Sequence, residues 1–434
     1  IMKSISRVLA FSFAVLASCG VYAAERPTFR AACVKVDITP DTPQWLQGYA
    51  PRQTEGVHGR IFHRIVAMDD GTTTFYLVAS DICVISPSFY DDFTKRLEKE
   101  TGISAKHVWW STSHTHSAPH VGPQDLGALF TAALGDRFSI KSDTDYWTFV
   151  VDKIVMGIKE ARSKLEPARL GIGVGTANAN INRRELRDGQ IVLGENSDGP
   201  VDRQLGLIRL ERNDGSPIGL IANYAIHGTC LHGGNKQISG DVPGWVSAYV
   251  EERIGAPMLF VNGAEGNVAP FPTVGNDISD PRIKSFDETL GQPILALNKS
   301  VAETTDNVTL NIGKTIVETP RKEGLGWLDE LAAYTTTVEG VHHVRIPVFS
   351  LTINDNTVIW AAPLELFSEI AVNVRASSPF KSTLYFGLTN GSLMYLPTKS
   401  AFDEGGYEPS VSPFTPRAEA DFSGGVSRYL QSLR

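Results

Sequence analysis

"GRIFHRIVAMDDGTTTFYLVASDI", residues 59–82, sets two apolar runs on either side of the turn pair Asp70-Gly71. Apolar and β-branched residues interrupted by Asp-Gly are typical of a β-hairpin. Residues 87–102, "PSFYDDFTKRLEKETG", follow as a helix that Gly102 ends, and the apolar run "HVWWST" then predicts a buried strand. The segment therefore predicts a hairpin, a helix and a returning strand.

The same order recurs twice further along the chain. Residues 205–227 turn at Asn213-Asp214-Gly215, residues 345–365 turn at 354–356, and a helical segment and an apolar strand follow each hairpin. Such alternation predicts an α/β fold with mixed β-sheets built from hairpin-helix-strand units and covered by helices. Because no low-complexity linker divides the chain, we expect one large domain.

Polar residues fall at equivalent places in the three units. They follow either the second hairpin strand (Asp81, His227 and Glu365) or the returning strand (His114, the turn 263–266 and Tyr395). Loops at one edge of a sheet commonly build ligand sites. One hypothesis is a degenerate structural repeat whose loops converge on one site; the alternative is that the pattern recurs by chance.

The segments between the units give three further expectations. Residues 143–166 have the apolar spacing of an amphipathic helix. Residues 183–204 form a polar, glycine-containing stretch that predicts a loop, and residues 271–340 predict turns and short helices.

The charge balance excludes one class of partner. The 434 residues carry a formal net charge of −8 and contain no block of basic residues. Nucleic-acid binding needs clustered Lys and Arg, so we expect no nucleic-acid partner.

The N-terminus has the pattern of an export signal. Lys3 and Arg7 precede the short apolar run 8–17, and Val21-Tyr22-Ala23 suits signal peptidase. We expect residues 1–23 to be a signal peptide and residues 24–434 to form a periplasmic or secreted domain. Alternatively, "LASCG" resembles a bacterial lipobox, in which case a lipid on Cys19 would tether the protein to a membrane. Cys33, Cys83 and Cys230 show no metal-binding spacing; they indicate buried free thiols or, alternatively, one disulfide.

Three histidines stand within "STSHTHSAPH", residues 111–120. His114 and His116 would share a side if the strand continued through them, and two imidazoles are good zinc ligands. The pair alone is also compatible with hydrogen-bonded loop histidines. His227 and Glu365 strengthen the metal hypothesis, because each closes an apolar strand, where a buried polar group needs a partner.

Together these motifs resemble the neutral/alkaline non-lysosomal ceramidase family. The resemblance covers about residues 30–430 and rests on strings in the family's order: "HGRIF", "STSHTHSAP", "NINRR", "HGT", "ISGDVPG", "NGAEGNVAP", "PLELFSE", "GLTN", "YLPT" and "GGYE". The chain ends soon after "GGYE", so we expect the catalytic N-terminal domain without the family's C-terminal β-sandwich.

The resemblance implies one Zn²⁺ held by His114, His227, Glu365 and Tyr395. It also implies that His116, Arg183 and Tyr407 act on the substrate carbonyl, and that zinc-bound hydroxide cleaves an amide bond. His116 would also carry a proton to the leaving amine. Asp81 and Asp241 are candidates to orient the ligand imidazoles, or else cap turns.

The sequence departs from the family at one stretch. "GNVAP" has Asn267 and Ala269 where ceramidases have an acid and an active-site serine, so we expect a substrate other than ceramide. Glu265 would supply a replacement carboxylate or face solvent, and the loop around Tyr49 would line a more polar pocket.

We therefore expect an exported zinc-dependent amidase acting on an N-acyl lipid or glycan substrate. The first alternative is a metal-dependent carbohydrate-active enzyme, an esterase, deacetylase or lyase. The second is a non-catalytic binding protein. The oligomeric state stays open.

Overall fold

The three predicted hairpins each belong to a separate β-sheet. The computed structural model describes residues 28–123, 127–128 and 142–434 together with the first residue. Apart from residue 1, the predicted signal sequence, including Cys19, lies outside the described residues. No helix in the described part of the chain has the length and apolar character needed to cross a bilayer.

The first sheet contains the hairpin that turns at Asp70-Gly71. Its strands in spatial order are β7 (Val108–Thr112), β6 (Thr74–Ser80), β5 (Phe62–Asp69), β1 (Arg30–Asp37) and β8 (Glu166–Pro167). Helix α1 (Pro87–Thr101) connects β6 to β7 and ends at Gly102, whose φ of 74° is left-handed. The returning strand β7 pairs with β6 in parallel.

The second and third sheets have the same plan. The second contains β15 (Met258–Asn262), β13 (Pro217–Tyr224), β12 (Gln204–Glu211) and β9 (Arg169–Thr176), with α4 (Asp241–Ile254) before β15. The third contains β17 (Leu310–Pro320), β19 (Val341–Ile353), β20 (Thr357–Ala361) and β22 (Ser382–Phe386), with α6 (Ser368–Ser377) before β22 and β18 (Thr335–Val338) beside β19.

The three units occupy equivalent strands. In each, the second hairpin strand pairs in parallel with the returning strand over five residue pairs. The last pairs are Ser80 with Thr112, Tyr224 with Asn262 and Ala361 with Phe386. The structure therefore confirms the repeat hypothesis, and the loops after these pairs all leave the same end of their sheets.

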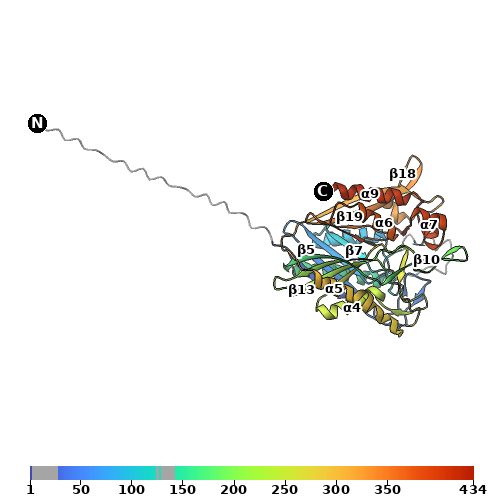
Figure 1. Cartoon of the computed structure of the whole chain (residues 1–434), viewed down its shortest axis with the longest axis horizontal. Helices are drawn as coiled ribbons and strands as arrows, with labels where there is room; N and C mark the ends of the chain where they lie inside the picture. The colour runs from blue at the N-terminus through green and yellow to red at the C-terminus, as the bar shows by residue number, and fades with distance from the viewer. Residues whose placement is uncertain (2–27, 124–126, 129–141) are drawn as a thin grey trace.

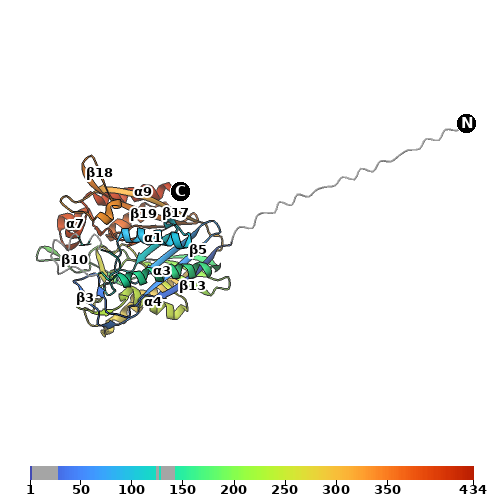
Figure 2. The same cartoon turned by 180° about the vertical axis from the view of Figure 1, so that it is seen from behind.

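The sheets pack around a shared core. Their inner faces contribute to one cluster that includes Trp109, Ile221 and Ile359. Helices cover the outer faces: α1 and α3 (Thr144–Ser163) on the first sheet, α4 and α5 (Gln292–Ser300) on the second, and α6 and α9 (Ala418–Ser432) on the third. Figure 1 shows α4 and α5 on the side opposite α6 and α9, and Figure 2 shows α1 and α3 on the reverse. The central strands β6, β13 and β20 and the returning strands β7, β15 and β22 are mostly apolar because both of their faces are buried.

Short ladders and helices complete the frame of the loops. The ladders pair β2 (Trp45–Leu46) with β3 (Arg52–Gln53), β4 (Gly56–Val57) with β14 (Gln237–Ile238), and β21 (Glu365–Leu366) with β23 (Tyr395–Leu396). Helices α7 (Lys399–Glu404) and α8 (Tyr407–Val411) follow, and 3-10 or π turns occupy Ala105–His107, Pro281–Lys284, Asp287–Gly291 and Asp329–Tyr334.

Two expectations about the connecting segments are wrong. Residues 183–204 contain a hairpin of β10 (Asn180–Arg187) and β11 (Gln190–Asn196), and β10 also pairs with β16 (Val268–Pro270). The turn at Asp188-Gly189 provides the two positive φ angles of a tight hairpin. Residues 271–340 contain the strands β17 and β18 in addition to short helices. The amphipathic helix is confirmed as α3.

Candidate metal centre

The predicted metal ligands lie on the loops that leave the three sheets. His114 comes two residues after β7, His227 three residues after β13, and Glu365 begins β21 just after β20. The first two loops are joined by backbone hydrogen bonds between His116 N and Gly228 O (2.9 Å) and between Gly228 N and His114 O (3.2 Å). Equivalent strand ends therefore bring distant residues together.

Four donor atoms converge at this point. Glu365 Oε2 lies 3.3 Å from His114 Nε2 and 3.5 Å from His227 Nε2, and Tyr395 Oη lies 3.4 Å from His227 Nε2. Tyr395 enters through the β21–β23 ladder, where it is the direct register partner of Glu365. All four residues are buried. The structure thus brings together the complete ligand set that the resemblance implied.

Backbone carbonyls orient the two imidazoles. His114 Nδ1 lies 3.2 Å from Cys83 O, and His227 Nδ1 lies 2.8 Å from Glu265 O. A ring that donates from Nδ1 presents the lone pair of Nε2, which is the arrangement that metal-bound histidines use. Of the two roles considered for Asp81 and Asp241, orientation of the rings is wrong, since Asp81 pairs with Arg64. The alternative of a turn cap is confirmed for Asp241, which accepts the backbone N–H groups of the 230–231 turn.

The donor set fits a divalent cation. Glu365 Oε2 is buried, and Nε2 of His114 and Nε2 of His227 both lie close to it, so its charge is balanced only by a proton on an imidazole or by a bound cation. Burial opposes ionisation of Glu365, but the adjacent His114 and His227 hold its pKa well below the usual value. Burial likewise opposes the charge on His114, yet Cys83 and Glu365 raise its pKa well above normal. His114, His227 and Glu365 therefore form a group that could hold a metal ion, with the Tyr395 hydroxyl beside it.

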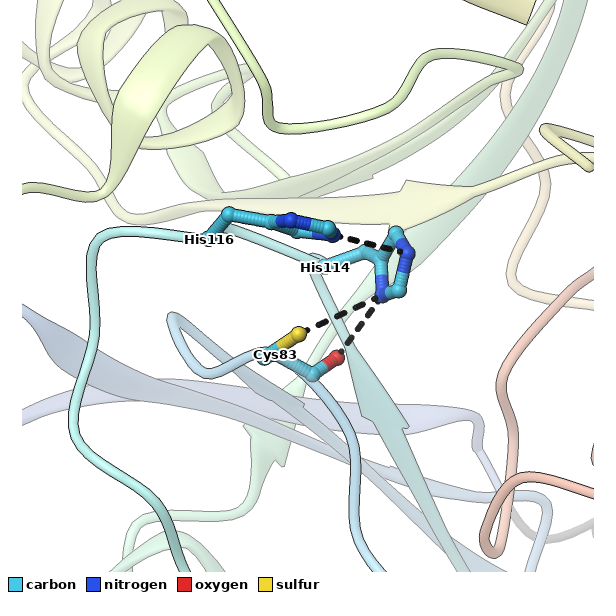
Figure 3. Close-up of side chains that lie close together, drawn as sticks. All are labelled: Cys83, His114 and His116. Atoms are coloured by element: carbon cyan, nitrogen blue, oxygen red, sulfur yellow. Dashed lines mark hydrogen bonds between the residues drawn. The ribbon is translucent and has the colours of Figure 1, made fainter. Parts of the chain in front are cut away.

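His116 lies next to the donor atoms, as predicted, but the backbone conformation that places it there is not the predicted continuation of the strand. Strand β7 ends at Thr112, and His114 adopts a left-handed φ of 64°, so the two histidines do not share a strand face. Figure 3 shows the rings side by side nonetheless, with 3.3 Å between His116 Nε2 and His114 Nε2. Cys83 Sγ lies 3.8 Å from His114 Nδ1 on the other side. Burial, together with the charges on His114 and His227, holds the pKa of His116 well below normal.

The loop 45–53 forms a wall against His116. The ring of Tyr49 meets the His116 ring edge-on at 4.8 Å, and the Arg52 guanidinium donates to His116 O. Gly48 has a φ of 100°, and a Cβ there would overlap the His116 ring. Only glycine allows the backbone to approach this closely, so the loop fixes the orientation of the imidazole.

Arg183 and Tyr407 both lie beside the ring of Tyr395. The Arg183 guanidinium is 5.4 Å from the Tyr395 ring centroid, and the Tyr407 ring is 5.8 Å from it. Arg183 Nη2 is buried without a hydrogen-bond partner among the described residues. Tyr407 is 44% exposed, but partial desolvation and the charge of Glu365 still raise the pKa of its hydroxyl, which keeps its proton at neutral pH. Both groups are therefore donors beside the cluster.

A family model described as "Neutral/alkaline non-lysosomal ceramidase, N-terminal" matches residues 29–306. The chain belongs to this family. It is 27% identical to the neutral ceramidase of Pseudomonas aeruginosa over 278 residues, and 30% identical to neutral ceramidase A of Dictyostelium discoideum over 254 residues. These alignments cover 59% and 54% of this chain but only 40% and 35% of the two relatives.

The fold agrees with that of a solved family member. The crystal structure of neutral ceramidase from Pseudomonas aeruginosa superposes with a TM-score of 0.74 at 19% identity, covering 94% of this chain and 74% of that one. The likeness therefore extends beyond the matched N-terminal segment to the third sheet, which carries Glu365 and Tyr395.

The stretch that departs from the ceramidase pattern packs within the protein. Asn267 accepts from Ser368 N (2.9 Å) and donates to Glu369 Oε2 (2.7 Å), so its amide holds the start of α6. Ala269 lies on β16 opposite Ile181. Glu265 is completely buried, which makes the solvent-facing interpretation wrong. Both its carboxylate oxygens lack a hydrogen-bond partner among the described residues, and burial raises its pKa to about 8.

Sequence reasoning missed the backbone groups that orient the site. The carbonyls of Cys83 and Glu265 have no side-chain signature, because any residue offers the same oxygen. It also missed Glu408, which is completely buried beside Arg183. Glu408 directly follows Tyr407 in "GGYE", so the motif itself contained the signal.

Proposed function

We propose that this ceramidase-family protein is a zinc-dependent hydrolase that cleaves the amide bond of an N-acyl substrate. The observation that carries the proposal is the buried Oε2 of Glu365, which lies 3.3 Å from His114 Nε2 and 3.5 Å from His227 Nε2 in a group that could hold a metal ion. A buried carboxylate between two oriented imidazoles is costly unless a cation joins them. A binding protein without a catalytic role would have no need to keep this arrangement.

His114, His227, Glu365 and Tyr395 would hold the ion. When bound, zinc acidifies water and polarises a carbonyl oxygen, so hydrolysis proceeds near neutral pH.

Arg183 and Tyr407 would receive the negative charge that develops on the substrate oxygen. Arg183 Nη2 has no partner among the described residues, and the Tyr407 hydroxyl remains a donor because its pKa is raised to about 12. As water adds to the carbonyl carbon, the C=O electron pair moves onto the oxygen, and two fixed donors stabilise it more than solvent would. Removing one such donor typically costs about 100-fold or more in turnover.

His116 would move the proton. Its lowered pKa keeps the imidazole uncharged, and Nε2 lies beside the donor cluster. It takes the proton that the attacking water releases and gives it to the nitrogen as the C–N bond breaks, leaving a carboxylic acid and an amine. Tyr49 and Gly48 hold the ring for both transfers.

The substrate is an N-acyl lipid or glycan amide other than ceramide. Ala269 offers no hydroxyl, so a step or contact that uses the family's serine is absent here. We also propose that the protein is exported to the periplasm or secreted, or is tethered through Cys19, on the strength of its N-terminal pattern. Intact mass after cell fractionation would identify the mature N-terminus and any lipid.

The test compares purified wild type with Glu365→Gln on ceramide, other N-acyl amides, O-acylated sugars and uronic-acid polymers. We expect zinc-dependent release of a carboxylic acid from an N-acyl amide, lost in Glu365→Gln and retained in the control Glu369→Gln. Glu369 lies on α6 and bonds to Asn267 instead of the donor cluster. Cleavage of sugars alone, or undiminished amidase activity in Glu365→Gln, would contradict the proposal.

A further inference from the structure

A completely buried carboxylate joins two consecutive arginines at the edge of the site. Glu408 Oε1 accepts from Arg183 Nε at 2.8 Å, and Glu408 Oε2 accepts from Arg184 Nη1 at 2.8 Å. Both arginines are buried. An irregularity in the pairing between Asn182 and Arg184 allows two neighbours on one strand to approach the same carboxylate.

Arg184 connects this ion pair to the loop between α7 and α8. Its Nη2 donates to Gly405 O (2.8 Å) and Glu404 Oε2 (3.1 Å). A Cβ on Gly406 would lie 2.9 Å from Ile191 Cγ2 and 3.2 Å from Arg184 Nη1, so glycine lets the loop lie against the guanidinium. Tyr407 is the next residue, and its place therefore depends on Arg184.

The same guanidinium reaches the segment that carries a predicted metal ligand. It lies 5.6 Å from the ring centroid of Phe367, two residues after Glu365. Arg184, on β10, thus contacts both the loop between α7 and α8 and the residue that follows β21. Arg183, by contrast, keeps Nη2 unpaired among the described residues and turns its face toward Tyr395.

We propose that Arg184 and Glu408 form a positioning brace for Arg183 and Tyr407. The two arginines have different roles. Arg183 donates a hydrogen bond to the substrate oxygen. Arg184 holds Arg183 in place through Glu408 and holds Tyr407 in place through the Gly405 carbonyl. The planar guanidinium of Arg184 donates hydrogen bonds to Glu408, Glu404 and Gly405 at once. Lysine would keep the positive charge but could not make all of these hydrogen bonds in the same geometry. This inference rests on the proposed function for the role of Arg183.

The first experiment measures kcat, KM, zinc stoichiometry and thermal midpoint for Arg184→Met, Arg184→Lys and a matched control, Arg375→Met. Arg375 makes two hydrogen bonds to Asp202, so the control also removes a paired arginine, but one that contacts none of the site residues. Displacing catalytic groups by about 1 Å costs on the order of 100-fold. We expect kcat to fall 10- to 100-fold in Arg184→Met and less in Arg184→Lys, with one zinc retained in each. A kcat that stays at the control's value would overturn the brace.

A double-mutant cycle separates positioning from mere stabilisation. If Arg184 acts through Arg183, the fall in kcat caused by Arg184→Met shrinks to less than threefold once Arg183→Met is present. Fully multiplicative effects of the two changes would overturn the proposal, because they would show that Arg184 acts independently.

A binding measurement keeps the brace testable if no amide is hydrolysed. Titration of zinc-loaded protein with inorganic phosphate reports on oxyanion binding at Arg183 and Tyr407. We expect at least a fivefold weaker Kd in Arg184→Met and an unchanged Kd in Arg375→Met. If wild type hydrolyses no amide but phosphate binds more weakly to Arg184→Met than to Arg375→Met, the proposed reaction is rejected and the brace is supported. Equal Kd values in the two variants would reject the brace.

Discussion

Replacing Glu265 with glutamine tests whether its buried carboxyl group is kept neutral in the folded protein. The backbone carbonyl of Glu265 accepts from His227 Nδ1. The Glu265 side chain is completely buried, and both carboxylate oxygens lack a partner among the described residues. Glutamine keeps the shape but stays neutral at every pH. Glu265→Gln should therefore stabilise the metal-free protein by an amount that depends on pH.

The magnitude follows from the weakened acidity of the buried carboxyl. Burial raises the pKa of Glu265 from 4.5 to about 8, so the folded protein retains a proton that the unfolded chain releases. Because each tenfold change in acidity is worth about 1.4 kcal/mol, wild type loses stability relative to the variant as pH rises from 4.5 to 8. The difference is about 1 kcal/mol at pH 5, about 3 kcal/mol at pH 7 and about 4 kcal/mol at pH 8. An unfolding entropy of about 2.1 cal/mol/K per residue converts these values to roughly 1, 4 and 5 °C in Tm.

Thermal unfolding of chelator-treated protein at these three pH values would measure the effect. Glu252→Gln is the control, since that side chain is 79% exposed and should shift Tm by less than 1 °C. Loading with zinc should reduce the difference, because a nearby cation favours the ionised form of Glu265. A difference in Tm that is the same at pH 5 and pH 8 would refute the reasoning, because the carboxyl would then titrate normally.

Further predictions concern the site itself. Glu365→Gln should weaken zinc binding at least 100-fold, as measured by competition with a chromophoric chelator, and should lower the Tm of the metal-free protein at neutral pH, because the carboxylate whose pKa His114 and His227 hold well below normal is lost. Zinc binding should release a proton, because the pKa of His114 is raised well above normal in the metal-free site; affinity should therefore fall as pH falls, and calorimetry in buffers of different ionisation enthalpy would detect the proton. Tyr407→Phe should lower kcat about 100-fold without changing zinc stoichiometry, and an undiminished kcat would exclude Tyr407 as a donor. Gly48→Ala should lower kcat and destabilise the fold by about 1–3 kcal/mol, because the new methyl group displaces His116; a variant with unchanged kcat and Tm would show that the loop does not fix the ring.

The repeated units were predictable because their signals are local. Asp70-Gly71 and Asn213-Asp214-Gly215 mark tight turns between apolar runs, and Gly102 ends the first helix with a left-handed φ. The three units placed His227 and Glu365 after their second hairpin strands and His114 after the returning strand of the first unit, all at the same end of the sheets. Tyr395 came only from the family resemblance, since a single tyrosine after a strand has no distinctive spacing.

The remaining features depend on contacts between distant segments. The β10–β11 hairpin carries charged residues between its apolar ones, so its composition indicated a loop, although the Asp188-Gly189 turn indicated a hairpin. The pairing of Glu408 with Arg183 spans 225 positions. The backbone oxygens that orient the histidines carry no residue-specific signal at all.

Every role proposed for the site requires four side chains from separate loops to bind one divalent cation. A crystal structure of the zinc-loaded protein, with anomalous scattering collected on both sides of the zinc edge, tests this most directly. We predict one peak within about 2.3 Å of His114 Nε2, His227 Nε2, Glu365 Oε2 and Tyr395 Oη. A full-occupancy zinc peak elsewhere, with these four side chains still in contact and no metal between them, would contradict it.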